Sequence, residues 1–219
     1  MARVALWPRG IAALAFILFA STVALAQVPG KDFQAIKSPQ PTESAGKVEV
    51  IEFFSYTCPH CQTLQQPLAA WLKRKPADVE FKRMPVVFQE SFLPFARLYY
   101  TLEAMGLVDR LHHDAFTAFH QQKMRLQDPK VAADWAASKG VDRQKFTDAY
   151  NSFGVQSLTK RAAENTRRYD IPFTPALVVD GRYLTGPSMT ATGNNLDYDR
   201  FFKVLDQMIA NARKKGGAR

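Results

Sequence analysis

The fold is decided by one stretch of the sequence, Val48-Glu49-Val50-Ile51-Glu52-Phe53-Phe54-Ser55-Tyr56-Thr57-Cys58-Pro59-His60-Cys61. Its β-branched and aromatic first half predicts a mostly buried strand. From Pro59 the pattern becomes helical, with Leu64 and Leu68 one turn apart. Proline suits a first helical turn, because the N–H that it lacks is not needed there. Cys58 is therefore expected where a buried strand passes into a helix.

The rest of the chain continues this alternation, with one interruption. A second strand is predicted over Val79–Val87. Strands return over Pro175–Val179 and Arg182–Thr185, on either side of the hairpin signal Asp180-Gly181. An amphipathic helix follows over Asp197–Arg213. Between the two halves the periodicity is helical only, over Leu93–Met105, Val108–Gln121, Lys130–Ser138, Arg143–Phe153 and Val155–Tyr169.

This order of elements predicts an α/β domain that carries an all-helical insertion. A strand–helix–strand half and a hairpin–helix half together make one domain, and the helical block lies between them in the sequence. The 219 residues suit one domain with a large insertion. We place the domain at residues 48–90 and 170–219, the insertion at 91–169 and an extended lead-in at 27–47.

The first 26 residues have a different character. Arg3 and Arg9 precede a short apolar run from Ile11 to Ala20, and Ala24-Leu25-Ala26 follows. These features are typical of a secretory signal peptide, which we expect to be cleaved after Ala26. The apolar run falls short of the about 20 residues that span a bilayer, although an uncleaved anchor stays an alternative. The sequence thus predicts an exported protein.

The charge pattern argues against a nucleic-acid protein. Lysine and arginine number 29 against 20 acidic residues, a formal net charge of +9. Proteins that bind nucleic acid usually gather such residues into a stripe or a recognised motif. Here they are scattered, apart from Lys73-Arg74-Lys75, Arg167-Arg168 and Arg213-Lys214-Lys215. We interpret them as a soluble basic surface.

The chain has two cysteines, Cys58 and Cys61. Exported proteins usually use a cysteine pair as a long-range staple, but a bridge across two residues closes a tiny loop and restricts the unfolded chain little. Chemistry explains this pair better than stability does. An inert bridge, or half of a zinc site completed by histidines from the helical block, stays open; the candidates are His112, His113 and His120.

The position of the pair assigns a different role to each cysteine. A helix N-terminus favours a thiolate at Cys58, and an imidazolium at His60 would stabilise the same anion. Cys61 lies one turn further on, within reach of Cys58 and less exposed. Cys58 is therefore expected to be the attacking or attacked sulfur, with Cys61 as the resolving partner.

Two further features point to the same site. Thr174-Pro175 leads a predicted strand, where a cis peptide would place the Thr174 backbone beside the sulfurs; an ordinary trans proline fits the sequence as well. Glu52 alternates with apolar residues, so its carboxylate needs a partner. We predict a partly buried pair with Arg83 beneath the site, from which Glu52 exchanges protons with Cys61. A bulge or edge that turns Glu52 to solvent is the alternative.

The stretch Glu52–Cys61 resembles the active-site segment of the DsbA family, the periplasmic disulfide oxidases of Gram-negative bacteria. Pro39-Gln40-Pro41-Thr42, Asn151-Ser152-Phe153 and the segment Thr174–Gly181 are similar to that family in kind and order. The resemblance covers nearly the whole mature chain. It implies a thioredoxin fold with an inserted all-helical domain and a cis Pro175.

The resemblance also implies roles for individual residues. Cys58 would be attacked by a substrate thiolate, giving a mixed disulfide, and a DsbB-like, quinone-linked membrane oxidase would reoxidise the pair. Glu52 matches the buried acid of the family, whose usual partner is a lysine. Arg83 stands in that place here, and arginine does not readily give up a proton. Thr174 stands where the best-known member has valine.

We therefore expect a periplasmic dithiol oxidase that introduces disulfides into reduced exported proteins. It is expected to act as a monomer, without a cofactor, a metal or nucleic acid. A reductase or isomerase of the same fold and a non-catalytic metal-binding module are the alternatives. The predicted site residues are Cys58, Cys61, His60, Pro175, Thr174 and Glu52.

Overall fold

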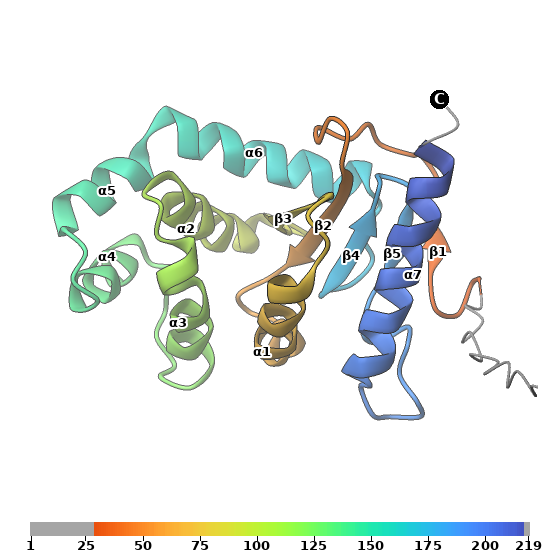
Figure 1. Cartoon of the computed structure of the whole chain (residues 1–219). Helices are drawn as coiled ribbons and strands as arrows, with labels where there is room; N and C mark the ends of the chain where they lie inside the picture. The colour runs from red at the N-terminus through yellow and green to blue at the C-terminus, as the bar shows by residue number, and fades with distance from the viewer. Residues whose placement is uncertain (1–28, 217–219) are drawn as a thin grey trace, which may run out of the picture.

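The computed structural model describes residues 29–216, and Figure 1 shows their arrangement. The predicted signal peptide at 1–26 lies outside the described residues. The strands are β1 (Gln34–Ala35), β2 (Val48–Phe54), β3 (Val79–Pro85), β4 (Ala176–Val179) and β5 (Tyr183–Thr185). The helices are α1 (Pro59–Arg74), the 3₁₀ turn η1 (Glu90–Phe92), α2 (Leu93–Ala104), α3 (Val108–His120), α4 (Pro129–Ser138), α5 (Arg143–Asn151), α6 (Phe153–Arg168) and α7 (Tyr198–Gly216). Within the described part, no helix combines the length and the apolar character needed to cross a membrane.

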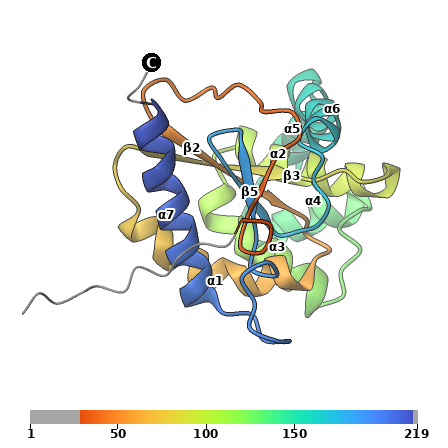
Figure 2. The ribbon, with the colours of Figure 1, turned by 90° about the vertical axis from the view of Figure 1, so that its right-hand side faces the viewer.

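The strands form one sheet in the order β1-β5-β4-β2-β3. β2 and β3 are parallel and are joined by α1, whereas β4 runs antiparallel to both β2 and β5. This sheet confirms the predicted α/β fold with a helical insertion, because helices α2–α6 lie between β3 and β4 in the chain. Residues Gln34–Ala35 of the lead-in add an edge strand beside β5 that the pattern did not indicate; in Figure 2 the orange lead-in runs past β5.

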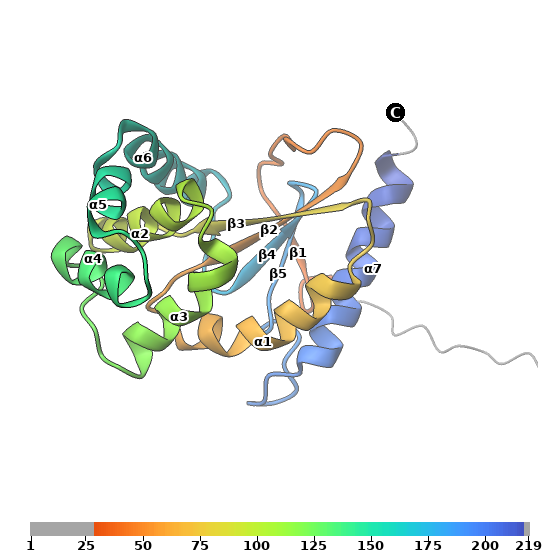
Figure 3. The same ribbon diagram turned by 60° about the vertical axis from the view of Figure 1, so that its left-hand side comes forward.

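Helices α1 and α7 cover one face of the sheet. Leu64 and Leu68 of α1 and Phe201 and Leu205 of α7 pack on Val50 of β2 in one buried cluster. In Figure 3, α1 runs between α7 and α3. One face of α1 therefore anchors it to the sheet, while its other flank meets the helical insertion.

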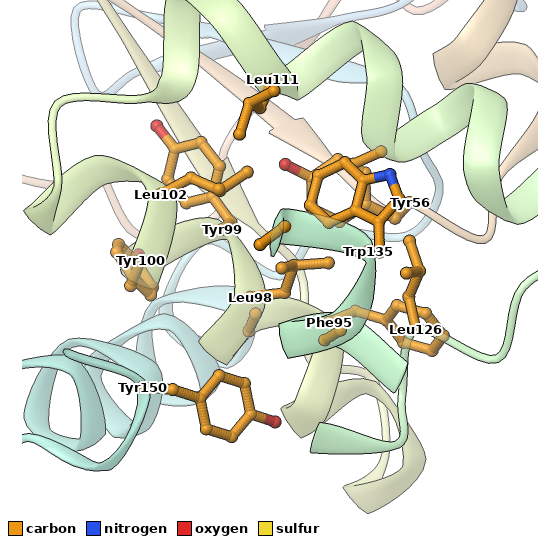
Figure 4. Close-up of a cluster of buried hydrophobic side chains, with 14 of the residues drawn as sticks. Tyr56, Phe95, Leu98, Tyr99, Tyr100, Leu102, Leu111, Leu126, Trp135 and Tyr150 are labelled. Atoms are coloured by element: carbon orange, nitrogen blue, oxygen red, sulfur yellow. The ribbon is translucent and has the colours of Figure 1, made fainter. Parts of the chain in front are cut away.

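The helical insertion has a core of its own, and β2 reaches into it. Phe54 at the end of β2 and Tyr56 just after it belong to the same buried cluster as Leu98, Phe116 and Trp135, part of which is shown in Figure 4. The strand that leads to the cysteines is thus fixed at both ends, by the sheet core and by the core of the insertion.

One predicted boundary was wrong. The sequence interpretation separated two helices at Gly154, but the chain breaks at Ser152, and Gly154 lies inside α6. The Ser152 side chain accepts a hydrogen bond from the backbone N–H of Val155 at 3.3 Å. Because serine satisfies one of the unpaired N–H groups of a new helix, Ser152 caps α6, which starts at Phe153, one residue before the glycine.

The predicted hairpin is confirmed. Asp180, Gly181 and Arg182 connect β4 and β5, so Arg182 belongs to the turn and not to the strand in which the sequence placed it. Asp180 and Gly181 have φ angles of 53° and 61°, and the Arg182 N–H closes the turn on the Val179 carbonyl oxygen at 3.1 Å; positive φ at both central positions matches the twist of the flanking strands. Gly181 also has no room for a side chain, because a Cβ there would overlap the carbonyl group of Gln40. The turn therefore holds the lead-in against the sheet.

Candidate active site

Cys58 lies at the mouth of α1, as predicted. It is the N-cap residue of the helix, with extended backbone angles, and Pro59 occupies the first turn. The backbone N–H of Cys61 points at the Cys58 sulfur, 3.4 Å away. Two complementary needs are met here. The helix end needs an acceptor for its free N–H groups, and a thiolate needs hydrogen-bond donors. The half-buried Cys58 sulfur satisfies both.

Thr174 and Pro175 come from a distant part of the chain to the same place. The peptide bond between them is cis, and the Cys58 sulfur lies 3.3 Å from the Thr174 carbonyl oxygen. That oxygen can bind only a protonated thiol, since it has no hydrogen to donate. The Thr174 side chain lowers the pKa of Cys58, because its hydroxyl, unlike the carbonyl oxygen, can donate to the thiolate.

These donors make Cys58 an acidic thiol. Its pKa is lowered to about 5, chiefly because the Cys61 thiol donates a hydrogen bond to the sulfur. The Thr174 side chain and the backbone N–H groups of Cys61 and His60 act in the same direction, while partial burial opposes them. At neutral pH Cys58 is therefore a thiolate, the form that attacks disulfides.

Cys61 is affected in the opposite direction. It is fully buried, and burial raises its pKa well above the ordinary value for cysteine. Its hydrogen bond to Cys58 and the negative charges of Cys58 and Glu52 raise it further. Two cysteines of one helical turn thus differ in charge, one a half-buried anion and the other a fully buried neutral donor.

His60 makes a backbone contribution to the site that the sequence did not indicate. Its side chain is exposed, and its contact with the Cys58 sulfur is made by its backbone N–H. Any effect of its imidazole on the thiolate stays a prediction. The motif therefore acts at least in part through the helix backbone.

Glu52 forms the predicted pair with Arg83. The two residues lie opposite each other in the parallel register of β2 and β3, and the Arg83 Nε donates to Glu52 Oε2 at 3.1 Å. Glu52 is fully buried, and Arg83 is mostly buried. Burial raises the pKa of Glu52, whereas the Arg83 charge and hydrogen bonds from Gln65 and Arg83 oppose the rise. The alternative of an exposed Glu52 is thereby excluded.

Two features of the site were not identified from the sequence. Gln65 is buried one turn after Cys61 and hydrogen-bonds both Glu52 and the Cys61 carbonyl; its four-residue spacing from Cys61 was the available signal. The Tyr56 hydroxyl shares a hydrogen bond of 2.9 Å with Nδ1 of buried His112. No group of three or more histidine, cysteine or acidic residues able to hold a metal occurs among residues 29–216.

Comparison with known proteins agrees with this geometry. The model of the DSBA-like thioredoxin domain matches residues 49–197. The chain belongs to the DsbA-like thioredoxin family. It is 46% identical over 166 residues to the thiol:disulfide interchange protein DsbA of Burkholderia cepacia, covering 75% of this chain and 78% of the relative. The corresponding protein of Bordetella parapertussis is 44% identical over 179 residues, covering 82% and 83%.

A solved structure of the family has the same architecture. The crystal structure of Pseudomonas aeruginosa DsbA superimposes with a TM-score of 0.81 at 31% identity, covering 87% of this chain and 97% of that one. The resemblance drawn from the motif is confirmed, and the fold is a thioredoxin fold with helices inserted between β3 and β4. The chain is a member of a family of thiol–disulfide oxidoreductases.

Proposed function

We propose that this chain is a dithiol oxidase that introduces disulfide bonds into exported proteins by exchange through Cys58 and Cys61. The opposite pKa shifts of the two cysteines are the observation that carries the proposal. A stabilised Cys58 thiolate stabilises the reduced protein, so the disulfide form becomes a stronger oxidant. The relatives at 44–46% identity are named thiol:disulfide interchange proteins, which supports the same activity here.

Exchange begins at Cys58, the more accessible of the two sulfurs. A substrate thiolate attacks Cys58 in the protein disulfide; the new bond joins the substrate to Cys58, and Cys61 leaves with the electron pair and takes up a proton. A second substrate thiolate then attacks the substrate sulfur of this mixed disulfide, and Cys58 leaves as a thiolate. The substrate loses two electrons and the protein gains them. Because the Cys58 thiolate is stable, it is a good leaving group.

The remaining site residues assist these steps. Thr174 and Pro175 lie beside the sulfur that the substrate joins, and His60 adds a backbone donor. Glu52 supplies the proton that Cys61 takes up, since buried Cys61 is remote from solvent and Glu52 lies close enough to raise its pKa. Residues 48–90 and 170–219 form the redox domain, and residues 91–169 the inserted helical domain.

The cellular setting follows from the same proposal. The protein acts in the periplasm after removal of residues 1–26, as a monomer. Its substrates are reduced exported proteins, and a DsbB-like, quinone-linked membrane oxidase regenerates its disulfide.

The test is disulfide transfer from the oxidised protein to a reduced peptide that contains two cysteines. We expect one substrate disulfide for each protein disulfide, and a trapped mixed disulfide at Cys58 when Cys61→Ser is mixed with an activated substrate thiol. A reduction potential near about −270 mV, the value for thioredoxin, would indicate a reductase instead. Stoichiometric tight metal binding without exchange would indicate a metal-binding module.

A further inference from the structure

The buried amide of Gln65 connects two parts of the site that take part in the same proposed step, Cys61 and Glu52. Its Nε2 lies 3.0 Å from the Cys61 carbonyl oxygen and 3.5 Å from Glu52 Oε1. The side chain is buried, on the face of α1 that meets β2. Both hydrogens of one amide nitrogen are thus directed at the residue that leaves during exchange and at the acid beneath it.

The direction of these bonds restricts the charge of Glu52. An amide nitrogen only donates, and so does the Arg83 Nε on the other carboxylate oxygen. Both Glu52 oxygens therefore accept, which suits the ionised carboxylate. A proton on Oε1 would face a donor, and only a rotated amide that presented its own oxygen could bind it. That rotation would release the Cys61 carbonyl.

We propose that Gln65 is a positioning residue. By bonding both Glu52 and the Cys61 carbonyl oxygen, it couples the protonation state of Glu52 to the position of the first turn of α1, which carries the sulfur that is released when the disulfide opens. The inference rests on the proposed function and assigns a residue within it. When the disulfide opens, Cys61 leaves with the electron pair and takes the proton of the Glu52 carboxyl group. The carboxylate that remains is the form that the Gln65 amide and the Arg83 guanidinium bind in the reduced protein.

The chemistry of an amide is needed for this role. Methionine has a similar length but donates no hydrogen bond, and a glutamate in its place would only accept and would repel Glu52. Both replacements remove a donor from the ionised carboxylate, so Glu52 should hold its proton to higher pH. The neighbouring Gln66 is exposed on the same helix, which gives matched controls for each change.

The experiment measures the rate of disulfide transfer from the oxidised full chain to a two-cysteine peptide across pH. For Gln65→Met we expect the inflection due to Glu52 to move to higher pH, by about one unit, the equivalent of a weak hydrogen bond to a charged group. Gln65→Glu should move it further in the same direction. Gln66→Met and Gln66→Glu should leave it in place, and thermal unfolding checks that every variant is folded.

A second background separates positioning from a structural effect. In Glu52→Gln no carboxyl group titrates at this position, so adding Gln65→Met should leave the shape of the pH profile unchanged. A uniform loss of rate at every pH in both backgrounds would show a merely structural role and overturn the inference. So would an inflection that Gln65→Met and Gln65→Glu leave in place.

The outcome for Glu52→Gln alone distinguishes failure of this inference from failure of the proposed function. If Glu52→Gln removes the inflection while the Gln65 variants do not move it, the Gln65 inference fails and the function stands. If Glu52→Gln changes nothing, the role of Glu52 and that of Gln65 both fail, although disulfide transfer persists. An oxidised wild-type protein that transfers no disulfide would overturn the proposed function itself.

Discussion

Removing the Cys61 thiol tests the electrostatic explanation of the site most directly. The hydrogen bond from Cys61 is the largest contribution to the low pKa of Cys58, about 5. In Cys61→Ala this donor is lost, while the backbone N–H of residue 61, which also points at the sulfur, is retained. Cys61→Ser keeps an O–H donor at the same position and is the matched control.

The expected magnitude follows from the strength of the lost bond. A hydrogen bond to a charged group contributes about 1.5–3 kcal/mol, which corresponds to about one to two pKa units. Because Cys58 is partly exposed, solvent screens part of this energy, and we take the lower limit of about one unit. At pH 7 the ratio of thiolate to thiol at Cys58 would fall from about 100:1 to about 10:1.

The measurement is the pH dependence of thiolate absorbance and of alkylation by iodoacetamide. Cys61→Ala should titrate about one unit above the wild type, and Cys61→Ser close to it. A Cys61→Ala variant that still titrates near pH 5 would show that the helix terminus alone makes the thiolate. One that titrates like a free cysteine, near about 8.5, would show that the backbone N–H groups contribute nothing. Either result refutes the reasoning.

Three further outcomes follow from the structure. Because folding lowers the pKa of Cys58, the reduced protein should be most stabilised relative to the oxidised one near the ordinary cysteine pKa of about 8.5, and this advantage should vanish as pH falls through about 5. It should also decline at higher pH, because folding raises the pKa of Cys61, which then ionises more readily in the unfolded chain; denaturant unfolding of both forms checks it. Thr174→Val removes a smaller contribution and should raise the pKa of Cys58 by less than Cys61→Ala does in the same titration. Gly181→Ala places a Cβ against Gln40 at a φ of +61°, whereas the Cβ of Gly46→Ala, at a φ of +71°, meets nothing within 4 Å. Thermal unfolding should show that Gly46→Ala lowers the free energy of unfolding by about 1 kcal/mol and that Gly181→Ala lowers it by more. Equal losses would contradict the contact with Gln40.

The sequence was sufficient where a local rule fixes the outcome. Alternation along β2 and β3 placed Glu52 and Arg83 on facing positions, because the side-chain period of a strand is two. The step from strand to helix at Pro59 placed Cys58 at a helix N-terminus. The hairpin at Asp180-Gly181 followed from its need for positive φ.

The sequence was insufficient where two elements must be oriented relative to each other. Whether Gln65 faces Glu52 depends on the rotation of α1 over the sheet, which its packing between α7 and α3 determines. The approach of Thr174 to Cys58 joins residues 116 positions apart. Ser152 and Gly154 compete as helix boundaries two residues apart, and helix ends are the least certain part of any sequence-based assignment.

The location of Glu52 supports the proposed role of the acid in the reaction, in preference to a role in the stability of the fold. On its face of β2, Val50 belongs to the core beneath α1 and α7, and Phe54 to the core of the insertion; Glu52 lies between them. A buried ion pair at such a seam costs several kcal/mol of desolvation, and apolar residues of similar volume are often as stable or more so. Packing alone would therefore favour a hydrophobic side chain at this position. What a hydrophobic residue cannot supply is a proton beside Cys61 at the moment when that buried sulfur leaves as an anion.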